Sequence, residues 1–508
     1  MSSSLSEQEI VRIQKKEALE ALGINPYPAA AFPTNTSAQD ILVHYPTEPA
    51  RYQQVVLAGR LMSRRIMGSA SFAELQDASG RIQLYVHRDT LCPESDKSFY
   101  NSVFKKLMDL GDIVGVHGHV FKTKMGVISV HVTQLTLLAK ALKPLPMVKE
   151  AVEQGVQKTY DAFTDPEQRY RQRYVDLIVN PHVRQTFIKR SQLIRSIRQY
   201  LESQGYLEVE TPILQPIYGG AAARPFKTHH NALDASLYLR IANELYLKRL
   251  IVGGYEGVYE FAKDFRNEGM SRFHNPEFTM LEVYVAYKDY LWMMDQVEVL
   301  LEKVALDLHG TTEIEVGEHT ISFRRPWQRF TMFEAIHHFT GIDMSRMGEE
   351  ALRDTAHKLG VSLEASAGTG KIIDEIFGAQ CEPKLIQPTF ITDYPIAMSP
   401  LAKRHRDNPA LVERFEVICN GKEICNAFSE LNDPMDQRQR FEEQRELGKR
   451  GDEEAMALDE DFLRALRYGM PPTVGVGIGI DRLSMIMANA PSIQEVIFFP
   501  QMRPENPT

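Results

Sequence analysis

Hydrophobic and polar residues alternate through most of the stretch from Val55 to about Leu138. Alternation with a period of two is typical of β-strands that bury one face. Turn residues, such as those at 77–80, separate the runs, and a helix is expected around Lys97–Leu110. The five expected strands read VVLAGRLMSRRI, SFAELQD, RIQLYVH, DIVGVHGHVFKT and ISVHVTQLTLL. Five short strands with an intervening helix predict an OB-fold barrel.

Helical periodicity appears on both sides of this stretch. Residues 1–22 are expected to form a helix that ends before Pro26. Phe187–Leu201 places its apolar residues on one helical face, ends before Gly205 and leads into an expected strand, YLEVETPIL. These patterns predict an α+β multidomain protein. Its expected parts are a helical extension over 1–50, the barrel over 51–143, a linker over 144–180 and a second domain over 181–508.

A polar loop joins two apolar runs within the second domain. Gly257–Phe265 alternates and Phe278–Glu282 is apolar, so an antiparallel strand pair with a functional loop is expected. Alternation groups polar and aromatic side chains on shared faces: Arg266 with Glu268, and Phe278 with Glu282 and Tyr284. Hydrophobic burial does not explain this grouping. The grouped side chains predict a site for a phosphate, a stacking base and a cation.

A second hairpin is expected within the segment FEVICNGKEICNAFSEL, residues 415–431. Asn420-Gly421 between apolar runs is typical of a two-residue type I′ turn. Pairing across that turn places Ile418 opposite Glu423 and Glu416 opposite Cys425. The two glutamates then lie diagonally on one face, where they would repel each other unless a cation lay between them. Mg²⁺ fits such a pair, but an exposed strand could equally carry both glutamates without a metal.

Composition and charge bound the class of protein. With 508 residues, 43% hydrophobic and 25% charged, the chain is expected to fold into two or three globular domains. The net charge of −9 by itself argues against a nucleic-acid-binding protein. Residues 60–143, however, hold 12 lysines and arginines against 7 aspartates and glutamates, so a basic module is joined to an acidic body. This distribution is compatible with an RNA partner.

Location can also be predicted from the sequence. We find no apolar run of eighteen residues, so no membrane span is expected. The first residues, MSSSLSEQEI, lack the features of a secretory signal. The four cysteines lie far apart without metal-ligand spacing, which favours reduced thiols. We therefore expect a cytoplasmic protein.

The loop segment FRNEGMSRFHNPEF, residues 265–278, resembles motif 2 of the class II aminoacyl-tRNA synthetases in their lysyl form. The expected helix and strand over 187–214 resemble motif 1, which builds the homodimer interface in that family. GVGIGIDR, residues 475–482, resembles motif 3, and its alternate glycines leave room for a ligand. Further segments of the same family resemblance are GGAAARPF (219–226), RIANELYLKRL (240–250) and SPLAKRHRDNP (399–409). The resemblance covers nearly the whole chain.

The resemblance implies a role for each matching residue. Arg266 and Arg482 are the implied catalytic residues, because Arg266 would bridge the α-phosphate and the lysine carboxylate and Arg482 would reach the γ-phosphate. In the ATP site, Glu268 and Asn275 would contact adenine, His274 would lie near the phosphates, and Phe278 and Arg482 would sandwich the base.

The implied lysine-binding residues are Gly220, Glu244, Arg266, Glu282, Tyr284, Asn426, Phe428 and Glu430. Glu416 and Glu423 match the family's metal ligands, for two or three Mg²⁺ ions bound with ATP. In the barrel, Phe72 resembles the base-stacking aromatic of the anticodon site and Gln83 a base-edge contact.

These assignments require an irregular strand. Strict alternation puts Asn426, Phe428 and Glu430 on the face opposite Glu423, although the resemblance assigns both sets to one pocket. We therefore predict a β-bulge or a sharp twist between Glu423 and Asn426.

The chain departs from the family pattern at three positions. Proline is expected where Asn243 stands, a smaller residue at Val474, and threonine or arginine at Phe273. None of these changes removes a ligand from the site, although the role of Phe273 stays open.

The implied function is activation of L-lysine with ATP and Mg²⁺ and transfer of the lysyl group to the 3′ end of tRNA(Lys), by a bacterial-type cytoplasmic homodimer. An aspartyl or asparaginyl synthetase is one alternative, but its pocket should be cationic, whereas this one holds Glu282 and Glu430. A lysine ligase acting on protein is another, but such relatives lack the barrel that residues 55–138 supply. Intact Arg266 and Arg482 argue against a third alternative, an inactive amino-acid sensor or RNA-binding module.

Overall fold

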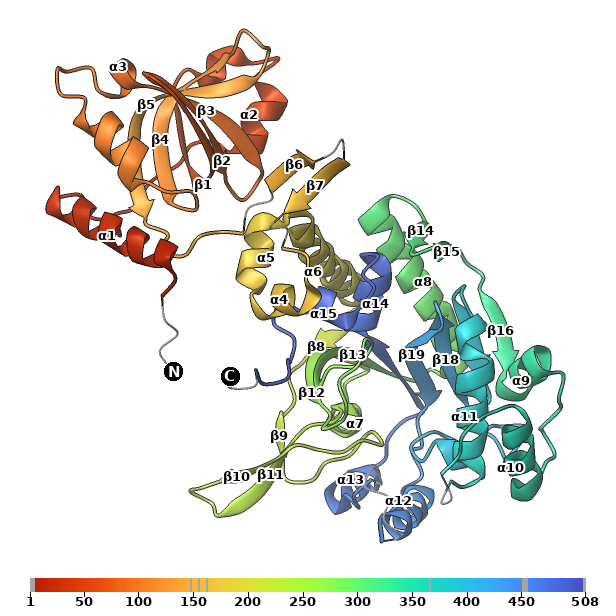
Figure 1. Ribbon diagram of the computed structural model, residues 1–508. Coiled ribbons are helices and arrows are strands. Elements are labelled where there is room, and N and C mark those ends of the chain that lie inside the picture. The colour runs from red at the N-terminus through yellow and green to blue at the C-terminus, as the bar shows by residue number, and fades with distance from the viewer. Residues whose placement is uncertain are drawn as a thin grey trace. The chain divides into compact units, whose positions relative to one another are not determined.

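The computed structural model describes residues 5–146, 149–153, 156–160, 163–364, 367–449 and 456–505. The chain divides into two compact units, Met1–Phe163 and Thr164–Thr508 (Figure 1).

The first unit contains a closed five-stranded barrel with strand order β1-β2-β3-β5-β4. The alternating runs do form these strands, and the helix expected between β3 and β4 is η2 (Phe99–Leu107). The OB-fold prediction is confirmed. The strands are β1 (Val55–Met67), β2 (Ala70–Gln76), β3 (Arg81–His87), β4 (Ile113–Lys122) and β5 (Ile128–Ala139).

Helices cover the barrel and share its core. The expected N-terminal helix is α1 (Glu7–Ala21), which begins with a capping box between Ser6 and Glu9. Its Leu19 belongs to the same buried cluster as the barrel's valines and leucines. The unit's other elements are α2 (Ala38–His44), η1 (Pro49–Tyr52), α3 (Arg88–Leu91), β6 (Lys149–Glu153) and β7 (Val156–Tyr160).

The second unit is built on an eight-stranded sheet with order β16-β17-β18-β19-β20-β13-β12-β8. All neighbouring pairs from β17 to β12 are antiparallel, and only the outermost pairs, β16–β17 and β12–β8, are parallel. The strands are β8 (Leu207–Glu208), β12 (Gly257–Phe265), β13 (Glu277–Ala286), β16 (Gln328–Thr331), β17 (Thr389–Thr392), β18 (Arg414–Cys419), β19 (Lys422–Ser429) and β20 (Thr473–Gly479). This is the α+β plan expected from the sequence.

The remaining elements of this unit cover the sheet or extend from it. The helices are α4 (Pro166–Arg171), α5 (Arg173–Val179), α6 (Pro181–Ser203), α7 (Glu244–Val252), α8 (Tyr290–His309), α9 (Met332–Thr340), α10 (Glu349–Lys358), α11 (Thr369–Gln380), α12 (Pro434–Lys449), α13 (Glu460–Leu466), α14 (Ile480–Met487) and α15 (Ile493–Val496), with short helices η3 (Glu382–Lys384) and η4 (Ile396–Met398). The minor strands are β9 (Leu214–Gln215), β10 (Lys227–His230), β11 (Ala235–Leu239), β14 (Glu313–Val316) and β15 (His319–Ser322).

Two local expectations need correction. The helix expected at Phe187 begins earlier, at Pro181, because proline suits the first helical position. The single strand expected over 206–214 is wrong. Only the two-residue strands β8 and β9 form there, because Pro212, which has no N–H to donate, stands between them.

The two expected hairpins do form. β12 pairs with β13 from Gly257–Val285 to Phe265–Glu277. Asn420 and Gly421 both have positive φ, 51° and 71°, as a type I′ turn requires.

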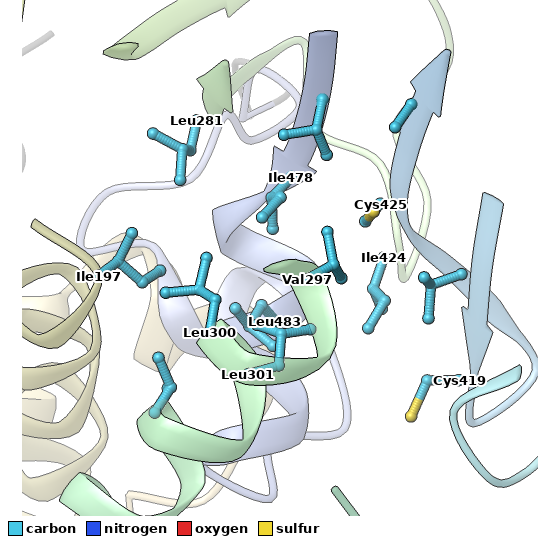
Figure 2. Packing of buried hydrophobic residues seen from close by; sticks show 14 of the residues in the cluster. Ile197, Leu281, Val297, Leu300, Leu301, Cys419, Ile424, Cys425, Ile478 and Leu483 are labelled. Carbon is cyan, nitrogen blue, oxygen red and sulfur yellow. The ribbon is translucent and has the colours of Figure 1, made fainter. Parts of the chain in front are cut away.

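The predicted bulge between Glu423 and Asn426 is present. The register shifts so that Ile418 faces Glu423 while Val417 faces Cys425, and Ile424 is the extra residue. Consecutive residues Ile424 and Cys425 both lie in the hydrophobic core, which returns Asn426 to the face of Glu423 (Figure 2). The bulge also corrects one expected pair, because Glu416 lies opposite Asn426 rather than Cys425.

Alternation divides the sheet into an apolar face and a polar face. Helices α6, α8 and α14 cover the apolar face (Figure 1), where Leu281, Val476 and Ile478 are buried. Figure 2 shows leucines of α8 and α14 against this face. The intervening residues of the same strands, including Glu282 and Gly477, therefore point to the opposite face. Among the described residues, none of the helices is long and apolar enough to cross a bilayer.

Candidate active site

Glycines of β20 form the floor of the polar face. A Cβ atom placed on Gly475 would lie 2.2 Å from Glu430 Oε1 and 2.5 Å from Tyr284 Cε1. One on Gly477 would lie 3.9 Å from Glu282 Oε1. The alternate glycines therefore allow three polar side chains to converge on the strand, as expected from their spacing.

Three buried glutamates from distant segments gather over this floor. Glu244 begins α7, Glu282 lies on β13, and Glu430 follows β19. The Tyr284 hydroxyl donates to Glu282 Oε2 at 2.7 Å. Gly220, with φ of +90°, lies against Glu244, since an added Cβ would approach Glu244 Cβ to 3.2 Å. The structure thus brings together five of the residues predicted to bind lysine.

Lys248 is a pocket residue that sequence reasoning missed. Its ammonium pairs with Glu244 Oε1 and Glu430 Oε2, and its side chain has 0% exposure. The ammonium also lies 5.4 Å from the centroid of the Phe428 ring, within cation–π range. A signal was present in the sequence, because Lys248 stands four residues after Glu244 on an expected helix.

The carboxylates outnumber the cation that the structure pairs with them. Within the described part of the chain, Lys248 is the only basic residue recorded in an ion pair with Glu244, Glu282 or Glu430. Burial, reinforced by Glu244 and Asp264, raises the pKa of Glu282 to about 8. Burial also raises the pKa of Glu430 well above its usual range, although Lys248 opposes this. The arrangement can therefore accept further positive charge.

Two arginines mark the neighbouring part of the site. The Arg266 guanidinium carbon lies 5.1 Å from the centroid of the Phe278 ring. Among the described residues, no hydrogen-bond partner reaches the buried Arg266 Nε. Arg482 Nη1 donates to the Glu423 carbonyl at 2.8 Å, and its Nη2 lies 3.2 Å from His274 Nε2. These side chains present cationic groups beside an aromatic ring, an arrangement that suits a nucleotide.

The other residues expected to bind ATP differ in how exposed they are. Asn275 is buried and uses its side chain within the protein, donating to Glu277 O at 2.5 Å and accepting from Gln501 N at 3.2 Å. Glu268 and His274 are exposed on the loop. Partial desolvation, followed by the field of Arg482, lowers the pKa of His274, which favours its neutral form.

Glu416 and Glu423 lie on one face, as the metal hypothesis requires. Burial and the neighbouring Glu423 raise the pKa of Glu416 to about 7, as expected for two carboxylates that repel each other. Within the described ranges, no third histidine, cysteine, aspartate or glutamate joins them in a ligand cluster. A pair of carboxylates fits Mg²⁺, which binds proteins through one or two carboxylates and takes its other ligands from phosphates and water.

Arg414 is a second residue of the site that was not predicted from the sequence. It is the first residue of β18, and its guanidinium donates to Asn426 Oδ1 at 3.0 Å, Glu416 Oε1 at 2.5 Å and Ser399 Oγ at 2.7 Å. One arginine therefore links a predicted metal ligand to a predicted lysine-binding residue. No motif or spacing in the sequence distinguished this arginine from an ordinary strand residue.

The three departures from the family pattern leave the pocket intact. Asn243 donates to Glu260 Oε2 at 2.9 Å, a contact that proline could not make. Val474 belongs to the core on the opposite face of β20. Phe273 lies near two cations, with Lys422 Nζ 5.5 Å from its ring centroid.

The barrel carries a separate candidate site on its outer face. Phe72 is paired with Tyr85 across β2 and β3, and their ring centroids lie 5.3 Å apart. Tyr85 also lies 5.1 Å from the ring of His131. Gln83 Oε1 accepts from Ser129 Oγ at 2.8 Å on the same face. Half-buried rings beside an amide form a surface on which unpaired bases can stack.

Comparison with known proteins finds two family matches. Residues 165–503 match the family described as tRNA synthetases class II (D, K and N), and residues 55–138 match the OB-fold nucleic acid binding domain.

Whole-length relatives share one function in their names. The chain is 61% identical over 502 residues to the lysine–tRNA ligase of Porphyromonas gingivalis, a match that covers 99% of this chain and 86% of that protein. It is 58% identical to the lysine–tRNA ligase of Christiangramia forsetii, covering 99% and 87% of the two chains. For the lysine–tRNA ligase of Azobacteroides pseudotrichonymphae the identity is 56%, with 99% of each chain covered.

Proposed function

The chain belongs to the class II tRNA synthetases, among the lysine–tRNA ligases, and from that premise we propose how its site acts. The reaction is ATP-dependent activation of L-lysine to lysyl-adenylate, followed by transfer to the 3′ end of tRNA(Lys). One observation carries the proposal: a buried pocket of Glu244, Glu282 and Glu430, in which Lys248 is the one paired lysine among the described residues, lies on the sheet face to which alternation assigns Arg266.

Adenylate formation depends mainly on position and charge. The lysine carboxylate is itself the nucleophile, so the enzyme must hold it in line with the α-phosphate and neutralise the charge that develops there. Arg266 suits this role because its fork can contact oxygens of both reactants. Phe278 and Arg482 would enclose the adenine, supported by the aromatic and cationic groups placed there.

Amino-acid selection would take place over the β20 glycines. Glu430 Oε1 lies over Gly475 without a hydrogen-bond partner among the described residues, and Glu282 Oε1 lies over Gly477. An ε-ammonium placed between these oxygens would supply the missing cation. Glu244, beside Gly220, would hold the α-ammonium at the other end of the substrate. Aspartate would meet repulsion at the same place, and the neutral side chain of asparagine would leave the carboxylates without a cation, which disfavours the aspartyl and asparaginyl alternatives.

Mg²⁺ would be held by Glu416 and Glu423 together with the ATP phosphates. Bound there, the ion supplies positive charge to the phosphates. Arg414 would keep the Glu416 carboxylate and the Asn426 amide in position, as its hydrogen bonds to both indicate.

The barrel would read the anticodon through Phe72 and Gln83. The aromatic surface around Tyr85 and the basic excess of residues 60–143 support an RNA partner. A lysine ligase acting on protein would have no use for this surface.

We also propose a homodimer in the cytoplasm. Exposed apolar side chains follow α6 along the chain, with Leu207, Ile213 and Leu214 exposed by 46%, 43% and 49%. Exposed apolar residues of this kind, in the edge strand β8 and the segment after it, are suited to contact with a second copy. The four cysteines are free and buried, which fits a reducing compartment.

The function predicts two measurable activities. Pyrophosphate–ATP exchange should depend on lysine and not on aspartate or asparagine, because the pocket is acidic. Charging with total tRNA should then attach lysine to tRNA. Exchange with aspartate in preference to lysine would contradict the proposal. Exchange with lysine but transfer only to protein would favour the protein-ligase alternative.

Lysine activation should depend on pH through Glu282. Its pKa of about 8 means that the carboxyl is protonated and neutral at pH 7, and ionised only at higher pH. Only the ionised carboxylate of Glu282 attracts a cation, and the ε-ammonium of the substrate stays charged throughout this pH range. The kcat/KM for lysine should therefore rise with pH, by up to about tenfold per pH unit below the pKa of Glu282. It should level off above about pH 8. Steady-state exchange at fixed saturating ATP measures it, and a flat profile from pH 6.5 to 8.5 would contradict the assignment.

A further inference from the structure

The pocket contains an ammonium group of its own. Lys248 lies on α7 with its side chain completely buried, and it pairs with two glutamates from different parts of the chain. Burial disfavours its charge, but Glu244 and Glu430 more than offset this and raise the pKa of Lys248. A lysine in this position is charged at neutral pH, and its ammonium is the same group that the substrate carries.

The two oxygens of Glu430 point to different partners. Oε2 is paired with Lys248, whereas Oε1 lies over Gly475 beside the Tyr284 ring. Glu244 is likewise occupied at Oε1 by Lys248. The lysine thus links the two carboxylates proposed to hold opposite ends of the substrate, and Glu430 Oε1 keeps no hydrogen-bond partner among the residues that the structure describes.

We infer that Lys248 is a positioning residue for amino-acid selection. Its ammonium fixes Glu244 and Glu430 relative to each other and neutralises part of their charge, so that the two ammonium groups of one lysine molecule complete the charge balance of the pocket. This inference rests on the proposed activation of lysine. Without Lys248, Glu244 and Glu430 would lose the cation paired with them and would bind protons more strongly, because buried carboxylates without a partner neutralise themselves. The substrate would then have to displace those protons in order to bind.

Lys248→Met tests the inference, because methionine is unbranched and carries no charge. We expect the kcat/KM for lysine at pH 7 to fall at least about tenfold and the midpoint of its pH profile to rise by about one unit or more. The KM for ATP should stay within about twofold, because the Lys248 ammonium contacts Glu244, Glu430 and the Phe428 and Phe462 rings, and none of these is a proposed ATP-binding residue. Arg249→Met is the matched control. This next residue of α7 pairs with Asp459 and Asp461 instead, and its loss should leave the lysine profile unchanged.

The outcomes separate the inference from the proposed function. Wild-type protein without lysine-dependent exchange would contradict the function itself. Wild-type activity combined with an unchanged lysine kcat/KM and pH midpoint in Lys248→Met would overturn only the inference. Equal losses for ATP and lysine would do the same, because they would indicate a general structural defect.

A second variant covers the case in which Lys248→Met does not fold. Lys248→Arg keeps the charge but replaces the compact ammonium with a planar fork. The inference predicts a raised lysine KM with the wild-type pH midpoint. Wild-type lysine kinetics in this variant would overturn it.

Discussion

Arg266→Ala is expected to reduce lysine-dependent pyrophosphate–ATP exchange by about a hundred- to a thousand-fold while leaving the fold intact. Arg266 follows β12, with its guanidinium over the Phe278 ring and its Nε free of partners among the described residues. In its proposed role, Arg266 donates a hydrogen bond to the reacting phosphate, and this hydrogen bond becomes stronger as negative charge develops on the phosphate. Removing one preorganised donor of this kind costs about 2.7–4 kcal/mol in the transition state. The loss should therefore appear mainly in kcat.

Exchange kinetics and thermal unfolding measured on the same preparation check this prediction. Lys263→Ala is the matched control, since Lys263 is a basic residue three positions earlier, in β12, whose Nζ lies 3.6 Å from Oε1 of the exposed Glu277. It should retain nearly full activity. Near-normal exchange by folded Arg266→Ala would show that the motif has been misplaced.

Glu430→Gln should lower the kcat/KM for lysine at least about a hundred-fold, with little change in ATP binding. Glu430 has 0% side-chain exposure and pairs with Lys248. Glutamine keeps the shape but removes the charge that both Lys248 and the substrate's ε-ammonium require. Leaving a buried charge without its partner costs roughly 3–5 kcal/mol. For the same reason, wild-type enzyme should use ornithine poorly and norleucine barely at all.

Calorimetry of ATP binding and exchange kinetics for lysine separate the two effects. Glu413→Gln serves as control because Glu413 is also a buried glutamate in an ion pair, with Arg406 Nε at 2.6 Å, but it lies outside the pocket. Its lysine kinetics should match the wild type. Wild-type lysine kinetics in Glu430→Gln, or efficient use of norleucine by the unmodified enzyme, would refute this basis for selectivity.

The sequence by itself determined the features that depend on neighbouring residues. Period-two alternation predicted the five barrel strands and placed Glu282 and Tyr284 on one face of β13. Asn420-Gly421 predicted the turn because few residues adopt the positive φ that it needs. The bulge could also be predicted, because the family resemblance assigned side chains on both sides of it to one pocket, which strict alternation does not allow.

The tertiary structure alone decided the features that depend on long-range packing. The position of the bulge at Ile424 changed the partner of Glu416 from Cys425 to Asn426. Alternation does not indicate which residue of a bulged strand is the extra one, because that depends on what the core accepts on the other side.

Dependence on long-range packing also explains why Lys248 and Arg414 were not predicted as site residues from the sequence. Lys248 and Arg414 would be solvated charges by composition alone, since such residues are seldom buried without a partner. Each has one partner close by in the chain, Glu244 or Glu416, but its second partner comes from another segment. α7 carries Lys248 to Glu430, and β18 carries Arg414 to Asn426. A buried charge is stable only where a folded partner meets it. The sequence therefore determined which groups face the pocket from each strand, and the tertiary structure decided how their charges are balanced.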